Sequence, residues 1–98
     1  MSQKHNLLAD LFQNFADQNR LKLLTMISSE SEKYCVDDLR KALKVTQPAV
    51  SRHFKILRDY DIVTLEKRGL NAFYKINQAK LEKYRGKMNA YFKELLGK

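Results

Sequence analysis

The stretch that decides the fold is VTQPAVSRHFKILR, residues 45–58. Thr46 is a favourable N-cap residue, because its hydroxyl can accept a hydrogen bond from a backbone N–H in the first turn of a helix. Pro48 lies where a proline is tolerated, since the first N–H groups of a helix have no helical acceptor. A helix is therefore predicted to begin directly after Thr46.

This predicted helix has two faces of opposite character. Val50, Phe54 and Leu57 recur at spacings of three and four and form an apolar stripe. The second stripe is wholly polar and consists of Gln47, Ser51, Lys55 and Arg58. The apolar face predicts packing against a core, whereas the polar side chains near the start of the helix suit base edges and the later basic ones suit phosphate.

A second short helix is predicted immediately upstream, over residues 36–43. Its apolar residues Val36, Leu39 and Leu43 follow helical spacing. Only Lys44 and Val45 separate this segment from Thr46. Two short helices joined by so tight a turn predict a helix-turn-helix.

A β-hairpin is predicted after the helix-turn-helix. Residues 62–65 are rich in β-branched side chains, residues 72–76 form a return strand, and the turn between them contains Gly69 and Asn71, which can take positive φ. The tip carries the polar residues Lys67, Arg68 and Asn71. They can contact phosphates or enter a minor groove, and the alternative is a solvated turn with ordinary surface charges. Together with the helix-turn-helix, the hairpin predicts a winged helix.

Three further helices complete the prediction. The first covers about residues 6–16, where the apolar residues are Leu7, Leu8, Leu11, Phe12 and Phe15. The next begins after the cap Asp17, and Arg20 is expected to hold Asp17 or a neighbouring carboxylate. The last covers about residues 78–96. The predicted fold is mainly α with a β-hairpin wing, about five helices plus two strands, in one domain spanning residues 1–98.

The apolar stripes of the first and last helices are wider than a small monomer needs, which predicts a twofold homodimer. The residues assigned to this interface are Leu8, Leu11, Phe12, Phe15, Leu81, Tyr84, Met88, Tyr91, Phe92 and Leu95. The alternative is that the last helix simply closes the core of its own protomer.

Composition restricts the class of partner and the compartment. The chain has 98 residues and a formal net charge of +8, with 44% hydrophobic residues, enough for a packed core. This combination favours nucleic acid or another polyanion over a merely basic solvated surface. Cys35 is the only cysteine, and no apolar run approaches bilayer length. A soluble cytoplasmic protein is expected.

Three segments resemble the ArsR-type family of winged-helix repressors. They are FADQNRLKLL at residues 15–24, YCVDDLRKALKVTQPAVSRHF at residues 34–54 and LEKRGLNAFY at residues 65–74. The resemblance covers nearly the whole chain. It implies a transcriptional regulator that dimerises through its first and last helices.

The expected function is sequence-specific binding of double-stranded DNA by a dimer, as a repressor on an inverted-repeat operator. Gln47, Ser51 and Arg52 are assigned to base edges. Thr46 is expected to cap the helix, and the first N–H groups of the helix are expected to approach a phosphate. The residues assigned to phosphate are Lys44, Lys55, Arg58, Lys67 and Arg68. The alternatives are a weakly specific architectural protein and an interaction module that antagonises another regulator. No constellation typical of an enzyme is present in the sequence.

The residues available for an effector are few. The resemblance implies that arsenic- and heavy-metal-sensing members carry a Cys-Val-Cys pair where this chain has Cys35-Val36-Asp37. Zinc-sensing members use carboxylate and histidine ligands on the last helix, and the last helix of this chain has no histidine. No cofactor and no small-molecule effector are therefore expected, apart from a mixed site of Cys35, Asp37 and His5 as a minor alternative. Cys35 is a candidate redox switch at a helix start, although a structural capping role is favoured. His53 is expected to be packed and hydrogen-bonded rather than a pH sensor or base contact.

Overall fold

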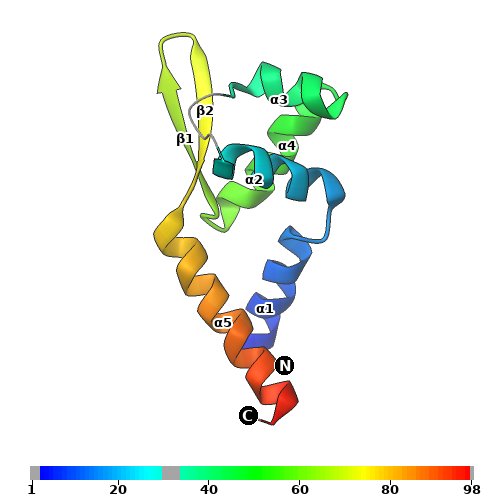
Figure 1. The fold of residues 1–98 in the computed structure, drawn as a ribbon, viewed down its shortest axis with the longest axis vertical. Coiled ribbons are helices and arrows are strands. Elements are labelled where there is room, and N and C mark those ends of the chain that lie inside the picture. The colour runs from blue at the N-terminus through cyan, green and yellow to red at the C-terminus, as the bar shows by residue number, and fades with distance from the viewer. Residues whose placement is uncertain (1–2, 30–33, 98) are drawn as a thin grey trace.

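The computed structural model describes residues 3–29 and 34–97 (Figure 1). Within these residues the elements, in chain order, are α1 (Gln3–Asn14), α2 (Gln18–Ser29), α3 (Val36–Leu43), α4 (Gln47–Asp59), β1 (Val63–Arg68), β2 (Asn71–Ile76) and α5 (Gln78–Leu96). The predicted five helices and two strands are confirmed. No helix in the described part of the chain has the length and apolar character to cross a membrane.

The helix α1 begins and ends earlier than its predicted range of 6–16. The N–H of Phe15 donates to the carbonyl of Phe12 at 3.1 Å, and that of Ala16 donates to Gln13 at 3.1 Å, which tightens the last turn and ends the helix. Asp17 then accepts hydrogen bonds from the N–H groups of Asn19 at 2.8 Å and Arg20 at 3.1 Å. The predicted cap of α2 is therefore confirmed.

The turn between α3 and α4 is built by a left-handed residue. Lys44 has φ 56° and donates its N–H to the carbonyl of Lys41 at 3.2 Å, while Val45 donates to Arg40 at 3.2 Å. This pair of bonds is a Schellman motif, which satisfies the last carbonyls of α3. Thr46 then caps α4 through its Oγ1, which accepts from the N–H of Ala49 at 3.3 Å. The predicted start of α4 is confirmed.

A second motif of the same kind ends α4 and directs the chain into β1. Asp61 has φ 58° and donates its N–H to Arg58 at 2.9 Å, and Ile62 donates to Leu57 at 3.0 Å. The side chains of Ile62 and Leu57 are both fully buried. Their burial supplies the apolar contact that accompanies this motif and fixes the exit direction of the chain.

The hairpin has the shortest common type of loop. The strands pair antiparallel from Val63 opposite Ile76 to Arg68 opposite Asn71, so only Gly69 and Leu70 lie between them. Gly69 has φ 61°, as the first central residue of a type II′ turn requires. Asn71 lies in β2 and does not take positive φ, because the two-residue loop places it directly in the strand pairing.

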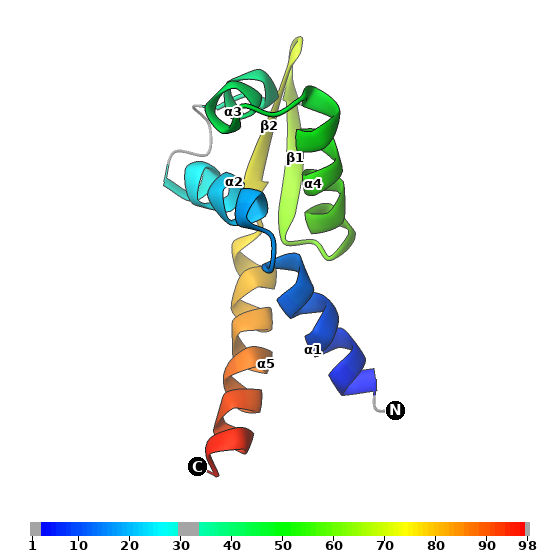
Figure 2. The ribbon, with the colours of Figure 1, turned by 90° about the vertical axis from the view of Figure 1, so that its right-hand side faces the viewer.

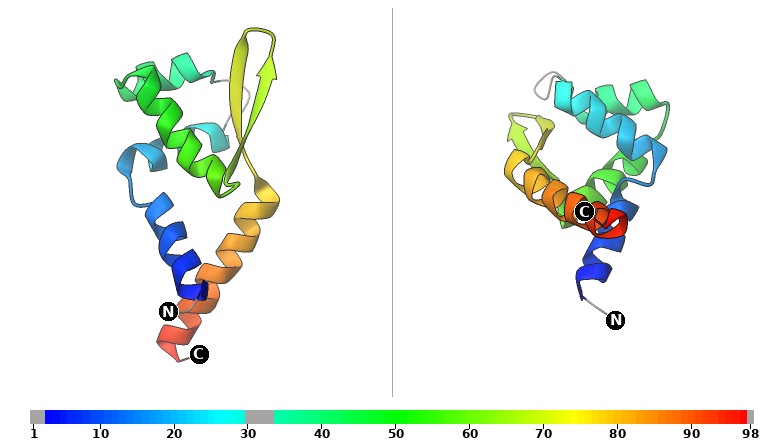
Figure 3. Two further views of the ribbon diagram at one scale, coloured as in Figure 1. Left: turned by 180° about the vertical axis from the view of Figure 1, so that it is seen from behind. Right: turned by 60° about the horizontal axis from the view of Figure 1, so that its bottom comes forward.

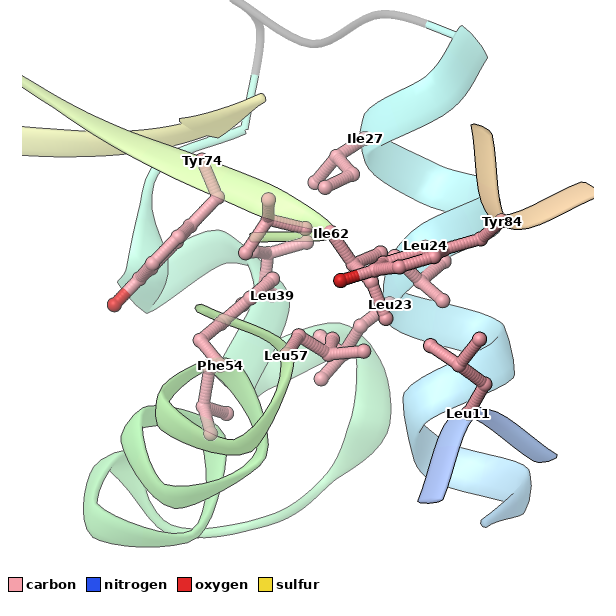
Figure 4. Packing of buried hydrophobic residues seen from close by; sticks show 12 residues of the cluster. Leu11, Leu23, Leu24, Ile27, Leu39, Phe54, Leu57, Ile62, Tyr74 and Tyr84 are labelled. Carbon is pink, nitrogen blue, oxygen red and sulfur yellow. The ribbon is translucent and has the colours of Figure 1, made fainter. Parts of the chain in front are cut away.

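The core lies between the helix-turn-helix, α2 and the hairpin (Figure 4). Leu23 and Ile27 of α2 are fully buried, as is Leu39 of α3. Phe54 of α4 stacks on Tyr74 of β2 with the ring centroids 3.7 Å apart and the planes 6° from parallel. This stack fixes the hairpin relative to α4.

The molecule is elongated, with principal extents of 49 × 23 × 21 Å. The hairpin tip lies at one end, and α1 and α5 extend from the body toward the other end (Figures 1 and 2). From behind, α1 and α5 form the two arms below the body (Figure 3). The two terminal helices are thus separated in space from the start of α4 and from the hairpin tip.

Three residues assigned to the dimer interface lie inside the protomer instead. Leu11 and Tyr84 belong to the buried core, and Leu8 is only 5% exposed. These three side chains face the body of the protomer or the other terminal helix. They are therefore not exposed to a partner. Of the other assigned residues, those packed partly against the same core are Phe15, Leu81 and Met88. Those that are exposed or half-buried on α1 and α5 are Phe12, Tyr91, Phe92 and Leu95.

Candidate nucleic-acid interface

The side chains assigned to base edges form an exposed stripe at the start of α4, beside the basic residues of the same helix. Gln47, Ser51 and Arg52 are all exposed, because Val50 and Phe54 take the opposite sector of the helix into the core. Within the described residues, none of these three side chains has a hydrogen-bond or ion-pair partner. Their donors and acceptors are therefore available to an external ligand, in keeping with the assignment to base edges.

The basic residues on and beside α4 differ in their surroundings. Lys44, at the left-handed turn, and Arg58 are both exposed. Lys55 forms an ion pair with Asp59, in which Nζ lies 3.3 Å from Oδ2. Asp59 therefore competes with a phosphate for Lys55. The i, i+4 spacing of Lys55 and Asp59 is the sequence signal that predicts this pair.

The hairpin carries a second charged group, organised by Glu66. Its carboxylate accepts from Nζ of Lys75 at 2.8 Å and from Nε of Arg68 at 3.2 Å. The Arg68 guanidinium also lies over the ring of Phe73, 5.6 Å from the centroid. Lys75 and then Arg68 hold the pKa of Glu66 below its usual range. Lys67, Arg68 and Asn71 are all exposed, and Arg68 is in addition held in place along the hairpin.

The back of α4 is joined to the junction of α1 and α2 by Arg20. Its Nε donates to the carbonyl of Asn14 at 2.9 Å, its Nη2 to that of Gln13 at 3.1 Å, and its Nη1 lies 3.3 Å from Nδ1 of His53. Arg20 therefore binds carbonyls and a histidine, rather than holding a carboxylate as the sequence suggested. Nε2 of His53 lies 4.0 Å from Oδ1 of Asp17, with the side chain 12% exposed. The prediction of a packed, hydrogen-bonded histidine is confirmed.

Cys35 caps α3 together with Asp38. Oδ2 of Asp38 accepts from the backbone N–H of Cys35 at 3.1 Å and lies 3.3 Å from its Sγ. This geometry is that of a capping box and supports the structural role of the cysteine. The alternative metal site is not assembled, because the His5 ring packs against Tyr91 of α5, with centroids 6.3 Å apart. No group of three metal-binding side chains occurs among the described residues.

The exposed start of α4, the tight turn from α3 and the basic hairpin lie at the same end of the molecule (Figures 1 and 2). A helix with a free polar stripe, supported by a preceding helix and flanked by a hairpin, is the arrangement that places side chains in a groove of duplex DNA. The fold and this surface define the class of winged helix-turn-helix DNA-binding proteins.

Comparison with known proteins identifies the family. Residues 17–64 match the model of the bacterial regulatory protein, arsR family. The chain is 38% identical over 66 residues to the arsenical resistance operon repressor of Bacillus subtilis, a match covering 67% of this chain and 62% of that protein. It is 32% identical over 75 residues to the repressor of the same name from Staphylococcus aureus, covering 76% and 70%. The chain belongs to the ArsR family of transcriptional regulators.

A solved structure supports the fold. It is the homodimeric winged helix-turn-helix DNA-binding domain of a Mycobacterium bovis protein, with a TM-score of 0.68 and 17% identity, covering 97% of this chain and 90% of that one. In the comparison with the Bacillus subtilis repressor, this chain spans less than two thirds of the length of that protein.

Proposed function

We propose that residues 1–98 act as one DNA-binding domain that forms a twofold dimer and represses transcription by occupying an inverted-repeat operator. The observation that carries this proposal is the exposed stripe of Gln47, Ser51 and Arg52, which has no partner among the described residues. Such side chains at the start of a helix match the acceptors and donors of the major groove, with Gln suited to adenine and Arg to guanine.

The charges around this stripe support binding of the DNA backbone. Lys44, Arg58 and Lys67 are exposed beside the stripe, and the whole chain carries a net charge of +8. If three or four phosphates are neutralised per protomer, the affinity of a dimer falls with salt with a log-log slope of about −6. Lys55 and Arg68 contribute less than their charge suggests, because Asp59 and Glu66 already hold them.

Dimerisation is supported by the apolar residues that α1 and α5 leave exposed. Phe12 is 37% exposed, Phe92 49% and Leu95 63%. The rings of Phe12 and Phe92 meet edge to face, with centroids 6.0 Å apart, so both helices contribute to one surface. A second copy related by a twofold axis covers this surface and presents two α4 helices to two half-sites. The homodimeric relative from Mycobacterium bovis supports this arrangement.

The experiment begins with selection of duplexes from a random library by the purified protein, followed by fluorescence anisotropy on the selected duplex and on a scrambled one. We expect an inverted repeat and binding about a hundredfold tighter to the selected duplex. Arg52→Ala should relax the preference at one position of each half-site, whereas Lys44→Ala should weaken binding to both duplexes equally.

Arg85→Ala is the matched control, because Arg85 is an exposed arginine of α5 paired with Glu82 at 2.6 Å, away from α4. It should leave both affinities unchanged. Equal affinity of the wild type for selected and scrambled duplexes would overturn sequence-specific repression and favour a weakly specific architectural role. Unchanged discrimination in Arg52→Ala would overturn the assignment of this residue to a base.

A further inference from the structure

The tip of the hairpin presents one large apolar side chain to solvent. Leu70 has a relative exposure of 105%, higher than that of any other exposed large hydrophobic residue among those described. The next most exposed, Leu96 at 69% and Leu95 at 63%, lie at the end of α5. The hairpin tip and α5 extend to opposite ends of the molecule (Figure 1). The proposed dimer surface therefore does not account for Leu70.

The shape of the tip makes this leucine a narrow projection. The loop contains only Gly69 and Leu70, and Gly69 has no side chain, with open space where a Cβ would lie. A two-residue hairpin turn ending in a single branched side chain is slim enough to approach a minor groove about 6 Å wide. The stack of Phe54 on Tyr74 fixes the hairpin relative to α4, so the direction of approach is set by the fold.

The charges beside Leu70 identify the chemistry of its partner. Lys67 and Arg68 precede the turn, and successive residues of a strand point to opposite faces, so one basic side chain lies on each side of the hairpin. A minor groove is likewise lined on each side by a phosphate strand. Glu66, the nearest carboxylate along the strand, is shared between Arg68 and Lys75, so this group of two cations and one anion keeps a net positive charge on the face that carries Arg68. An apolar tip between two cations suits DNA better than an apolar protein surface.

We propose that Leu70 is an apolar wedge that enters the minor groove beside each half-site and partly unstacks one base step. This inference rests on the proposed function, because it requires α4 to dock in the adjacent major groove. Wedges of this kind favour steps that unstack easily, so the operator carries a flexible pyrimidine–purine step, TA or CA, at the flank that the tip reaches. The wedge therefore favours a flexible step at this flank without forming a hydrogen bond to a base.

The test uses the duplex selected by the wild-type protein, with an adenine of the flanking step replaced by 2-aminopurine, whose fluorescence rises when its stacking is disrupted. Binding of the wild type should raise this fluorescence, and replacing the flexible step by a stiff A-tract should weaken binding about tenfold. Leu70→Ala should abolish the fluorescence rise. The Leu70→Ala protein should bind the selected duplex about tenfold more weakly and should no longer prefer the duplex with the flexible step over the duplex with the A-tract.

Leu70→Met, which keeps an apolar side chain of similar volume, should retain both signals. Leu21→Ala is the matched control, since Leu21 of α2 is 46% exposed and lies outside the hairpin. A Leu70→Ala protein with the fluorescence rise and flank preference of the wild type would overturn the wedge alone. Failure of the wild type to distinguish selected from scrambled duplex would overturn the proposed function, and the wedge with it.

Discussion

At the scale of single residues, Asp59 limits the contribution of Lys55 to DNA binding. Its carboxylate lies 3.3 Å from Nζ of Lys55 on an exposed face of α4. Asp59→Asn removes the negative charge that both competes for Lys55 and repels a nearby phosphate, so we expect affinity for the selected duplex to rise about threefold at 0.1 M salt. Fluorescence anisotropy measures the change. Glu82→Gln, which removes an equally exposed carboxylate from α5, should have a much smaller effect, and equal effects would contradict the prediction.

Asp17 is a second residue whose charge has a measurable consequence. The backbone N–H of Arg20 is the main cause that holds the pKa of Asp17 below its ordinary value of 3.8, and the N–H of Asn19 contributes in the same direction. A lowered native pKa stabilises the fold above the ordinary value, and this stabilisation is lost as the pH falls through the native pKa. Asp17→Ala should reduce the free energy of unfolding by about 1 kcal/mol at pH 7.

Urea unfolding at a series of pH values tests both statements about Asp17. The difference between wild type and Asp17→Ala should shrink as the pH falls below 3.8, because a protonated carboxyl is a weaker acceptor for the N–H groups of α2. Asp17→Asn should retain most of the cap at pH 7, since asparagine is also a favourable N-cap residue. A difference that does not change with pH would show that the charge of Asp17 is not involved.

At the scale of the elements, two tyrosines join the end of α4 to the terminal helices. The hydroxyl of Tyr84 on α5 donates to the carbonyl of Tyr60 at 2.7 Å, and the hydroxyl of Tyr60 donates to Asp10 on α1 at 2.8 Å. Tyr84→Phe leaves the Tyr60 carbonyl without this donor at a partly buried contact. We expect the free energy of unfolding to fall by about 1 kcal/mol, measured by urea unfolding. Tyr60→Phe removes an exposed bond and should cost less, and the reverse order would contradict this reasoning.

The elements differ in how far the sequence determines them. The bounds of α5 were predictable because Asn77 caps its start and Gly97, with φ 70°, ends it. The helix-turn-helix was predictable from Thr46 and Pro48 for the same reason, since local capping decides where such helices begin. The end of α1 was not, because Phe15 continues the apolar periodicity and only hydrogen bonding at the junction with α2 ends the helix.

The candidate site was predictable as a set of exposed side chains but not as a set of contacts. Helical spacing alone puts Gln47 and Ser51 on the polar face of α4. The engagement of Arg20 with His53 depends on residues 33 positions apart in the chain, which no local pattern relates. A wide apolar stripe also does not reveal which sector its own domain covers. For that reason Tyr84 was assigned to the dimer interface together with Phe92, although only Phe92 is exposed.

At the scale of the whole molecule, the 49 Å long axis separates two surfaces with different roles. The start of α4 and the hairpin tip lie toward one end, and the terminal helices α1 and α5 extend toward the other (Figure 2). A substitution at the second surface can therefore change assembly without changing the residues that face DNA. This separation makes the contribution of dimerisation to DNA binding measurable in a single variant.

Phe92→Glu is that variant, because it places a charge in the proposed interface at a side chain that is 49% exposed in the protomer. Light scattering should give the mass of a monomer, while circular dichroism should stay that of the wild type. A monomer contacts one half-site, so affinity should fall by a factor of about a hundred or more, and the salt slope should halve from about −6 to about −3. Leu21→Lys, at an exposed leucine of α2, should leave mass, affinity and slope unchanged. A Phe92→Glu protein that keeps the wild-type mass would place the dimer interface elsewhere, whereas a monomer with undiminished affinity would show that one half-site suffices.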